Sequence, residues 1–323
     1  MNDSHKIVDD MLKGFAFTRS DIQWYEDYRT VAYKEKNEKV GVMTLGGSGH
    51  EPAHAGFIGQ GMLDAAVVGN LFASPSPDQI LKAIEEVNTG KGVLVILKNY
   101  SGDLMNFSIA KELAEEEGIQ VNSVVVKDDV AVQDSTYSTG RRGIAGTIFV
   151  HKIAGAKAVE GGTLEEVMAA AQKAIDNIRS IGISMSACTL PGLEKPGFYL
   201  GENEIELGMG IHGEPGIRKM DMKTADELAE IMMEKILDDY DYRGQETAVL
   251  INGLGATPLM ELYVLAASLE KVFLKERIDA YRVFVGNYMT SLDMAGCSVS
   301  LLKLDKELKS LLDAPCKTPA LNV

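Results

Sequence analysis

The residues best suited to chemistry in this 323-residue chain follow short apolar runs that are typical of strands. His50 comes directly after the glycine-rich run 46–49. The other candidates, which follow further apolar runs, are Ser74, Lys98, Asp103 and His212. These side chains can hydrogen-bond a small polar molecule, and imidazole and carboxylate groups can also move protons. Loops at the carboxyl ends of neighbouring strands in an open α/β sheet meet at one rim. We therefore expect a small-molecule site, with His50 as a hydrogen-bonding or acid/base group.

Two other interpretations of the glycine-rich run are weaker. The glycine spacing fits neither a Walker phosphate loop nor a dinucleotide loop, and no lysine follows the run. His50 and His54 match the H-E-x-x-H pattern of zinc proteases, which requires both imidazoles on one helical face. Pro52 lies between them, and proline is tolerated only in the first turn of a helix. We expect a helix to begin near Pro52, His50 to stay in the loop, and no metal site to form.

Each candidate also has a purely structural interpretation. His50 or Asp103 could cap the helix that follows it, and Ser74 could hydrogen-bond only its own turn. Lys98 could be a surface charge at a strand end, and His212 a histidine satisfied inside the core. Spacing alone does not separate these interpretations from a functional one.

The elements that position the candidates alternate between strand and helix. In the first half, predicted strands are 30–33, 40–45, 65–69, 92–97 and 121–126, and predicted helices are 7–15, 78–87, a helix ending near 117, 144–157 and 164–181. In the second half, predicted strands are 205–211, 247–251, 280–285 and 298–302, and predicted helices are 224–237, 259–273 and 304–312. This alternation is typical of a mostly parallel sheet with helical crossovers. Past Ile183 the runs become shorter and proline and glycine more frequent. We therefore predict two α/β domains, 1–185 with the glycine-rich loop and 186–323 with His212, each a mostly parallel or mixed sheet flanked by helices.

Composition narrows the range of partners. The chain is 46% hydrophobic, which is enough to build a core, and carries a net charge of −15. So acidic a chain is a poor direct partner for nucleic acid or an anionic membrane. Three cysteines with no metal-binding spacing, and no signal peptide or apolar span, are what we expect of a cytoplasmic protein.

Several long motifs in a fixed order resemble one family, the dihydroxyacetone kinase K subunits (DhaK-type). They are Gly46-Gly-Ser-Gly-His-Glu-Pro52, Phe72-Ala-Ser-Pro-Ser-Pro77, Lys98-Asn-Tyr-Ser-Gly-Asp103, Gly140-Arg-Arg-Gly143, Gly210-Ile-His-Gly-Glu-Pro-Gly216, Gly255-Ala-Thr-Pro258, residues 286–296 and Thr318-Pro-Ala-Leu-Asn322. The resemblance covers nearly the whole chain.

The resemblance implies a ligand and a role for each candidate. His212 would hold dihydroxyacetone as a covalent hemiaminal, which distinguishes a ketose from glycerol. The ligand's oxygens would be held by Gly47, Ser74 and Lys98. His50 would be the acid/base partner in hemiaminal formation, and Asp103 the general base for the attacking hydroxyl. This chain would carry no cofactor, because nucleotide and Mg²⁺ would lie on a separate L subunit. A homodimer is also implied.

Two functional classes remain within the family. One is the K subunit of a phosphotransferase-system-dependent kinase, which works with the L subunit. The other is a ligand-sensing coactivator (DhaQ-type) of a TetR-type transcription regulator. Leu45 stands where the family usually has a glycine, and Asn70 where an acid is common. These departures remove no chemical group, but they narrowly favour the coactivator.

Overall fold

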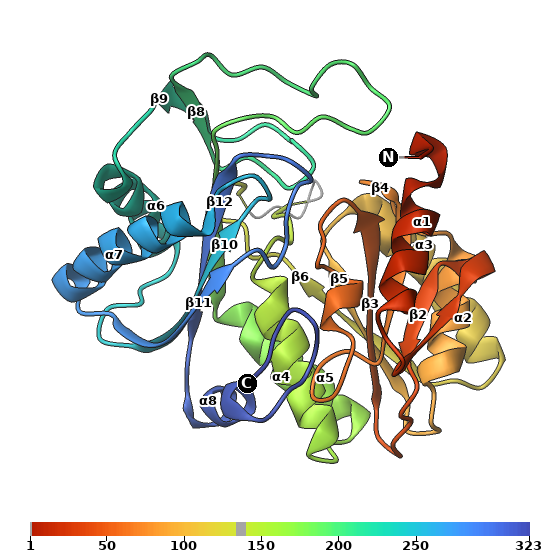
Figure 1. Ribbon diagram of the computed structural model, residues 1–323. Coiled ribbons are helices and arrows are strands. Elements are labelled where there is room, and N and C mark those ends of the chain that lie inside the picture. The colour runs from red at the N-terminus through yellow and green to blue at the C-terminus, as the bar shows by residue number, and fades with distance from the viewer. Residues whose placement is uncertain (1, 134–139) are drawn as a thin grey trace. The chain divides into compact units, whose positions relative to one another are not determined.

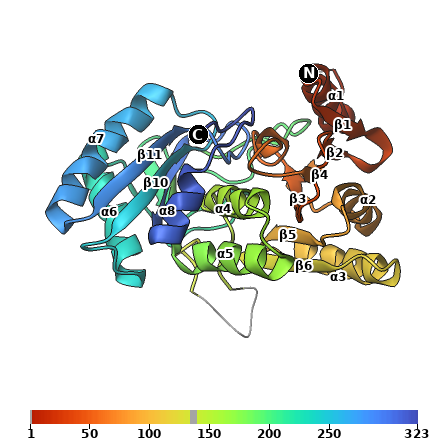
Figure 2. The same ribbon diagram turned by 90° about the horizontal axis from the view of Figure 1, so that it is seen from below.

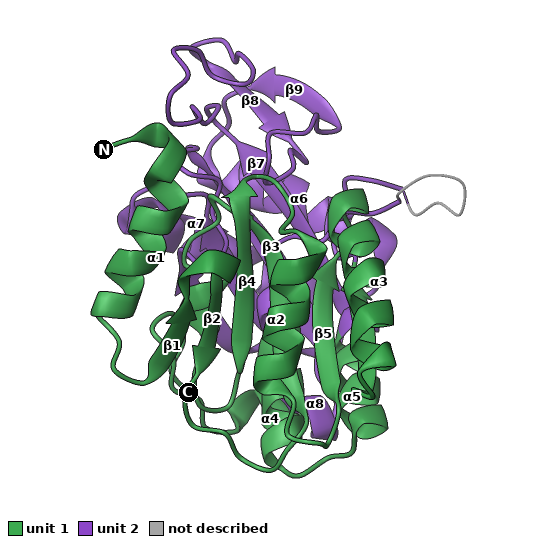
Figure 3. Ribbon diagram, turned by 90° about the vertical axis from the view of Figure 1, so that its right-hand side faces the viewer, with its two compact units in different colours: residues 1–126, 149–174, 310–323 green, residues 127–148, 175–309 purple. Residues whose placement is uncertain are grey.

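The computed structural model describes residues 2–133 and 140–323, which form two compact units (Figures 1 and 3). Unit 1 comprises residues 1–126, 149–174 and 310–323, and unit 2 comprises residues 127–148 and 175–309. This division differs from a single boundary near residue 185, because the chain leaves unit 1 and later returns to it with its last residues. No helix in the described ranges is long and apolar enough to cross a membrane.

Unit 1 is built on a six-stranded mixed sheet with strand order β1-β2-β4-β3-β5-β6. Strands β4, β3, β5 and β6 are parallel to one another, while β1 and β2 form an antiparallel edge. The elements in chain order are α1 (Ile7–Phe17), β1 (Ile22–Tyr25), β2 (Thr30–Tyr33), β3 (Gly41–Ser48), β4 (Ala65–Leu71), α2 (Pro77–Val87), β5 (Val93–Lys98), α3 (Ser101–Glu116), β6 (Val121–Val126), α4 (Thr147–Val159) and α5 (Leu164–Asp176).

The core of unit 1 lies between the sheet and helices α2 and α3, which pack side by side in front of it in Figure 3. All six residues of β5 are buried, as expected for a parallel strand covered on both faces. Helix α2 begins where the sequence says it should: Pro77 is its first residue, and the Ser76 amide donates to Gln79 Oε1 at 3.0 Å in a capping box. This cap fixes the loop in front of α2, which carries Ser74.

Unit 2 contains a second six-stranded sheet with strand order β11-β10-β12-β7-β8-β9. Only the β10–β11 pair is parallel. The elements are β7 (Ile178–Ser184), β8 (Glu204–Leu207), β9 (Arg218–Asp221), α6 (Ala225–Asp239), β10 (Glu246–Gly253), α7 (Leu259–Glu276), β11 (Asp279–Gly286) and β12 (Gly296–Lys303), followed by α8 (Lys306–Asp313). In Figure 2, α6 and α7 run alongside β10 and β11, and their apolar faces form the core with the sheet. The prediction of two mixed α/β sheets is confirmed.

Three local predictions differ from the structure. The predicted helix 164–181 stops at Asp176 and β7 begins at Ile178, because the segment pairs with β12 along its whole length and its isoleucines are buried. Strand β3 continues three residues beyond Leu45 into the glycines, since β4 still pairs with it there. The four-residue strands β1 and β9 were not predicted, whereas β2, which is equally short, was.

Candidate functional site

The rim of the unit 1 sheet gathers most of the predicted residues. Strands β4, β3 and β5 are neighbours and run parallel, so their carboxyl ends lie together. Ser48 ends β3, Lys98 ends β5, and the loop after β4 carries Ser74. The Ser48 hydroxyl donates to the Gly69 carbonyl at 2.7 Å, and the Phe72 amide donates to the Ser48 carbonyl at 2.9 Å. These bonds tie the glycine-rich loop to the loop after β4.

The glycines of this loop are required by close contacts. A Cβ on Gly46 would lie 2.6 Å from both Lys98 Nζ and His54 Nε2. On Gly47 it would lie 2.7 Å from the Ala73 amide nitrogen. Real Cβ atoms do not approach so closely, so only glycine lets this backbone pass over the lysine and the neighbouring loop.

His50 is completely buried and stacks on Phe72, with ring centroids 5.1 Å apart. It does not cap a helix at Pro52, because residues 51–54 form turns and only a short 3₁₀ segment follows, Ala55–Phe57. The prediction of a helix beginning near Pro52 is therefore wrong. The two imidazoles of the H-E-x-x-H match are not related by helical spacing, and His54 Nε2 instead contacts Lys98 Nζ at 2.8 Å.

Ser74 and Asp103 form a direct pair. The Ser74 hydroxyl donates to Asp103 Oδ1, although 29 residues separate the two along the chain. Asp103 lies in the first turn of α3 and is only 3% exposed. Gly102 makes room for the pair, because a Cβ there would lie 2.7 Å from Ser74 Oγ. A carboxylate in this position can act as a general base when a substrate hydroxyl lies within hydrogen-bond reach of it.

Lys98 is not a surface charge, since it is 1% exposed. Burial lowers the pKa of Lys98, and the nearby Asp103 carboxylate opposes this by raising it. The amino group lies beside the glycine loop, where a Cβ on Gly46 would be 2.6 Å from Nζ. It can therefore bind a ligand oxygen there, in either its charged or its neutral form.

His212 lies in unit 2, in the turn after β8, and its side chain is 19% exposed. It is therefore not a core histidine. Its Nδ1 lies 2.9 Å from Glu214 Oε1, and its backbone amide donates to Glu214 Oε2 at 2.9 Å. Burial raises the pKa of Glu214, but the hydrogen bonds and the electrostatic attraction of His212, with a backbone hydrogen bond of Glu214 itself, outweigh it and lower the pKa to about 2. An ionised carboxylate only accepts hydrogen bonds, so Nδ1 carries a proton, which places the lone pair of the neutral ring on Nε2.

Arg142 holds the segment that leads to His212. Its guanidinium donates to Asp129 Oδ2 at 2.8 Å and to the Gly208 carbonyl at 2.7 Å. Burial raises the pKa of Asp129 to about 6, although Arg142 acts to lower it. A Cβ on Gly210 would lie 2.1 Å from Glu214 Oε2 and 2.6 Å from Arg142 Nη1, so a larger residue there would displace the side chains that surround the turn.

Comparison with known proteins identifies the family. The Dak1 domain model matches residues 13–320. The chain belongs to the Dak1 domain family. This match confirms the family resemblance that we inferred from the sequence motifs.

Two relatives of the Dak1 chain are bacterial kinase subunits. The dihydroxyacetone-binding subunit DhaK of the PTS-dependent dihydroxyacetone kinase of Lactococcus lactis is 48% identical over 316 residues, covering 96% of this chain and 95% of the relative. The corresponding subunit of the PEP-dependent kinase of Escherichia coli is 41% identical over 349 residues, covering 100% and 98%.

Solved structures similar to the Dak1 chain fall into both functional classes. The dihydroxyacetone kinase operon co-activator DhaQ superposes with a TM-score of 0.91 at 38% identity, covering 97% of each chain. The dihydroxyacetone kinase of C. freundii superposes with a TM-score of 0.92 at 37% identity, covering all of this chain and 60% of the other. The fold alone therefore does not separate a kinase from a coactivator.

The two departures that favoured a coactivator lie in structural positions. Leu45 is completely buried in the core of the Dak1 chain, inside β3 and opposite Val67 of β4. The Asn70 side chain accepts a hydrogen bond from Arg29 at 2.6 Å, and Arg29 also pairs with Asp9 of α1. Neither side chain reaches the rim residues, so they give little support to a loss of catalysis.

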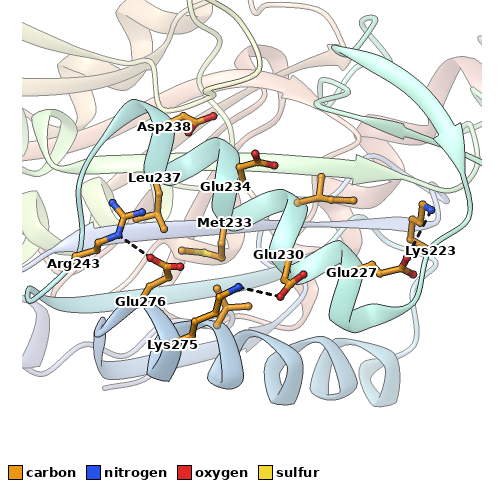
Figure 4. Close-up of a pocket in the computed structure, with 12 residues that line it drawn as sticks. Lys223, Glu227, Glu230, Met233, Glu234, Leu237, Asp238, Arg243, Lys275 and Glu276 are labelled. Atoms are coloured by element: carbon orange, nitrogen blue, oxygen red, sulfur yellow. Dashed lines mark hydrogen bonds and ion pairs between the residues drawn. The ribbon is translucent and has the colours of Figure 1, made fainter.

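A surface groove of about 510 Å³ lies between α6 and α7 in unit 2 (Figure 4). Ion pairs line it, such as Arg243 with Glu276 at 2.7 Å and Lys275 with Glu230 at 3.3 Å. None of the predicted site residues lies there. The groove is a solvated seam between helices whose charges are partly paired with one another, and we assign it no function.

Sequence reasoning missed three residues that position the candidates: His54, Arg142 and Glu214. Glu214 could have been found, because an acid two residues after a histidine can fold back onto the ring in a tight turn. Arg142 and His54 carried no comparable local signal, since their partners lie 66 and 44 residues away along the chain.

Proposed function

We propose that this chain is the dihydroxyacetone-binding subunit of a phosphotransferase-system-dependent dihydroxyacetone kinase. The observation that carries the proposal is the hydrogen bond from half-buried Ser74 to buried Asp103, beside Lys98 on the glycine-rich rim. A sensor needs a pocket that recognises its ligand, whereas a kinase also needs a base for the attacking hydroxyl. The relative at 48% identity, itself a PTS-dependent kinase subunit, supports the same choice.

The proposal assigns His212 to covalent capture of the ketose. Its Nε2 lone pair forms a bond to the carbonyl carbon while the C=O π bond breaks and the oxygen takes a proton. We assign that proton to His50. The Nδ1 proton leaves the ring toward Glu214, so the product is a neutral hemiaminal. Glycerol has no carbonyl group and cannot form this bond, which gives the subunit its selectivity.

The remaining residues bind the ligand and carry out the transfer. The ligand's oxygens are assigned to the Gly47 backbone, the Ser74 hydroxyl and the Lys98 amino group. Asp103 takes the proton of the terminal hydroxyl as that oxygen attacks phosphorus. The nucleotide and Mg²⁺ are assigned to a partner L subunit, and this chain is proposed to be a homodimer.

A coactivator role is the second candidate, because the co-activator DhaQ has the same fold at 38% identity. In that case the ligand would still bind, but the chain would regulate a TetR-type transcription factor and would need no base.

A turnover assay separates the two roles. The protein is mixed with nucleotide-loaded L subunit and dihydroxyacetone, and triose phosphate is followed over time. A kinase subunit gives sustained turnover, and Asp103→Asn abolishes it while leaving ligand binding within a few-fold of wild type. Ligand binding without turnover in the wild type would reject the kinase proposal in favour of the coactivator.

A further inference from the structure

Three basic side chains cluster behind the glycine-rich loop of unit 1: Lys98, His54 and His151. Their relative exposures are 1%, 2% and 0%. Lys98 Nζ lies 2.8 Å from His54 Nε2, and the His54 and His151 rings meet edge to face with centroids 6.3 Å apart. His54 belongs only to the rejected H-E-x-x-H match, His151 belongs to none of the motifs, and no proposed catalytic step uses either histidine.

The direction of the Lys98–His54 hydrogen bond follows from chemistry. When Lys98 is charged, its ammonium group only donates, so His54 Nε2 accepts and the ring proton lies on Nδ1. Burial, followed by the charge of Lys98, keeps the pKa of His54 well below its usual value. His54 is therefore a neutral imidazole that accepts from the lysine and does not compete with it for charge.

The pair lies directly beneath the loop. A Cβ on Gly46 would be 2.6 Å from each of the two nitrogen atoms, so the Gly46 backbone packs closely against the hydrogen-bonded pair. His151 in turn packs between the rings of His54 and Phe57, the latter with centroids 6.0 Å away. The chain of contacts thus runs from α4 through His54 to the amino group at the rim.

We propose that His54 is a positioning residue that holds the Lys98 amino group against Gly46, so that the lysine's other hydrogens face a ligand oxygen at the glycine-rich loop. The inference deepens the proposed function and rests on it. A flexible lysine placed by one buried acceptor loses little conformational entropy on binding, which makes the oxygen contact tighter and more selective.

The first test is a double-mutant cycle on ligand affinity. His54→Leu should weaken dihydroxyacetone binding about 10-fold, the effect of losing one hydrogen bond to a charged group. His54→Gln, whose side-chain oxygen can accept from the lysine, should recover part of that loss. On a Lys98→Met background, His54→Leu should cost no further affinity. His5→Leu, on the exposed amino-terminal segment, is the matched control and should bind as wild type does.

A second measurement does not depend on the ligand. Nitrogen-15 spectra of the free protein should show His54 as the Nδ1–H tautomer, and Lys98→Met should shift its Nε2 resonance. Two results would show that His54 only fills the core. One is a ligand affinity unchanged in His54→Leu, and the other is that His54→Leu weakens binding on the Lys98→Met background as much as it does in wild type. Wild-type protein that binds no dihydroxyacetone would overturn the proposed function together with the ligand part of this inference, whereas the spectra would still decide whether His54 holds Lys98.

Discussion

At the scale of single residues, pairs decide what each side chain can do. Asp103 could have been a simple helix cap, but Ser74 from another loop donates to it and it is nearly fully buried. His212 could have been a core histidine, but an ionised Glu214 selects one of its ring nitrogens. Asp103 is a candidate reactive group because a residue distant in sequence contacts it. His212 is one because a residue two positions later folds back onto its ring.

The covalent adduct gives a prediction for His212 and Glu214. Incubation with dihydroxyacetone, followed by intact-mass spectrometry, should show a gain of one ligand mass in wild type and none in His212→Ala. Glu214→Gln should reduce the adduct at least several-fold, because a neutral amide holds the Nδ1–H tautomer less firmly. An equal gain of mass in His212→Ala would place the attachment elsewhere.

His151 gives a prediction for stability against pH. Burial, followed by the charge of Lys98, lowers its pKa from 6.5 to about 3 in the folded protein. The unfolded state then binds more protons between these values, so this histidine's contribution is complete above pH 6.5 and is lost as pH falls toward 3. When the pH falls from about 7 to about 5, the free energy of unfolding should decrease in both proteins. The decrease should be about 2 kcal/mol smaller in His151→Phe than in wild type.

Urea denaturation at several pH values measures this difference, and groups common to both proteins largely cancel from it. Parallel stability curves for the two proteins would mean that His151 binds its proton as readily in the folded protein as in the unfolded chain.

At the scale of elements, the glycine-rich loop is an extension of a strand. Strand β3 keeps pairing with β4 through Gly46, so the loop backbone is held by the sheet and not only by its own turn. The loop after β4 is fixed from its other end by the capping box of α2. Two elements defined by local sequence thus hold the backbone of the rim in place.

Two glycine substitutions test this view. Gly46→Ala should weaken ligand binding and destabilise the protein by about 1–3 kcal/mol, because its Cβ would overlap buried side chains. Gly14→Ala is the matched control: Gly14 lies within α1, and an added Cβ would meet nothing within 4 Å. It should stabilise the protein by about 0.5–1 kcal/mol through helix propensity.

Thermal unfolding and calorimetric titration would measure both substitutions. If Gly46→Ala bound the ligand as well as wild type does, the loop or the side chains beneath it would have to move to accept the added Cβ.

At the scale of the whole molecule, the chain carries its reactive groups on two units, each with its own sheet and core. A net charge of −15 makes direct binding to DNA unfavourable, so even the coactivator role would act through a protein partner. The choice between kinase and coactivator is therefore a choice of partner protein.

A pull-down identifies that partner. Tagged protein is recovered from cells supplied with dihydroxyacetone, and the retained proteins are identified by mass. We expect the L subunit, with retention weakened as salt is raised if charged surfaces form the contact. Recovery of a DNA-binding regulator in place of the L subunit would favour the coactivator.

The sequence by itself determined the α/β class, most strands and helices, and the residues of the rim, because periodicity, capping signals and strand-end loops are local properties. Tertiary structure decided what local signals do not contain. Ile178–Ser184 is a strand because β12 and β8 flank it, although the sequence continued a helical pattern into it. Likewise, Lys98 meets His54 only because a sheet and a turn bring together residues 44 positions apart. Burial and long-range pairing set the charge, the tautomer and the orientation of these side chains. Burial and pairing exist only once the chain has folded.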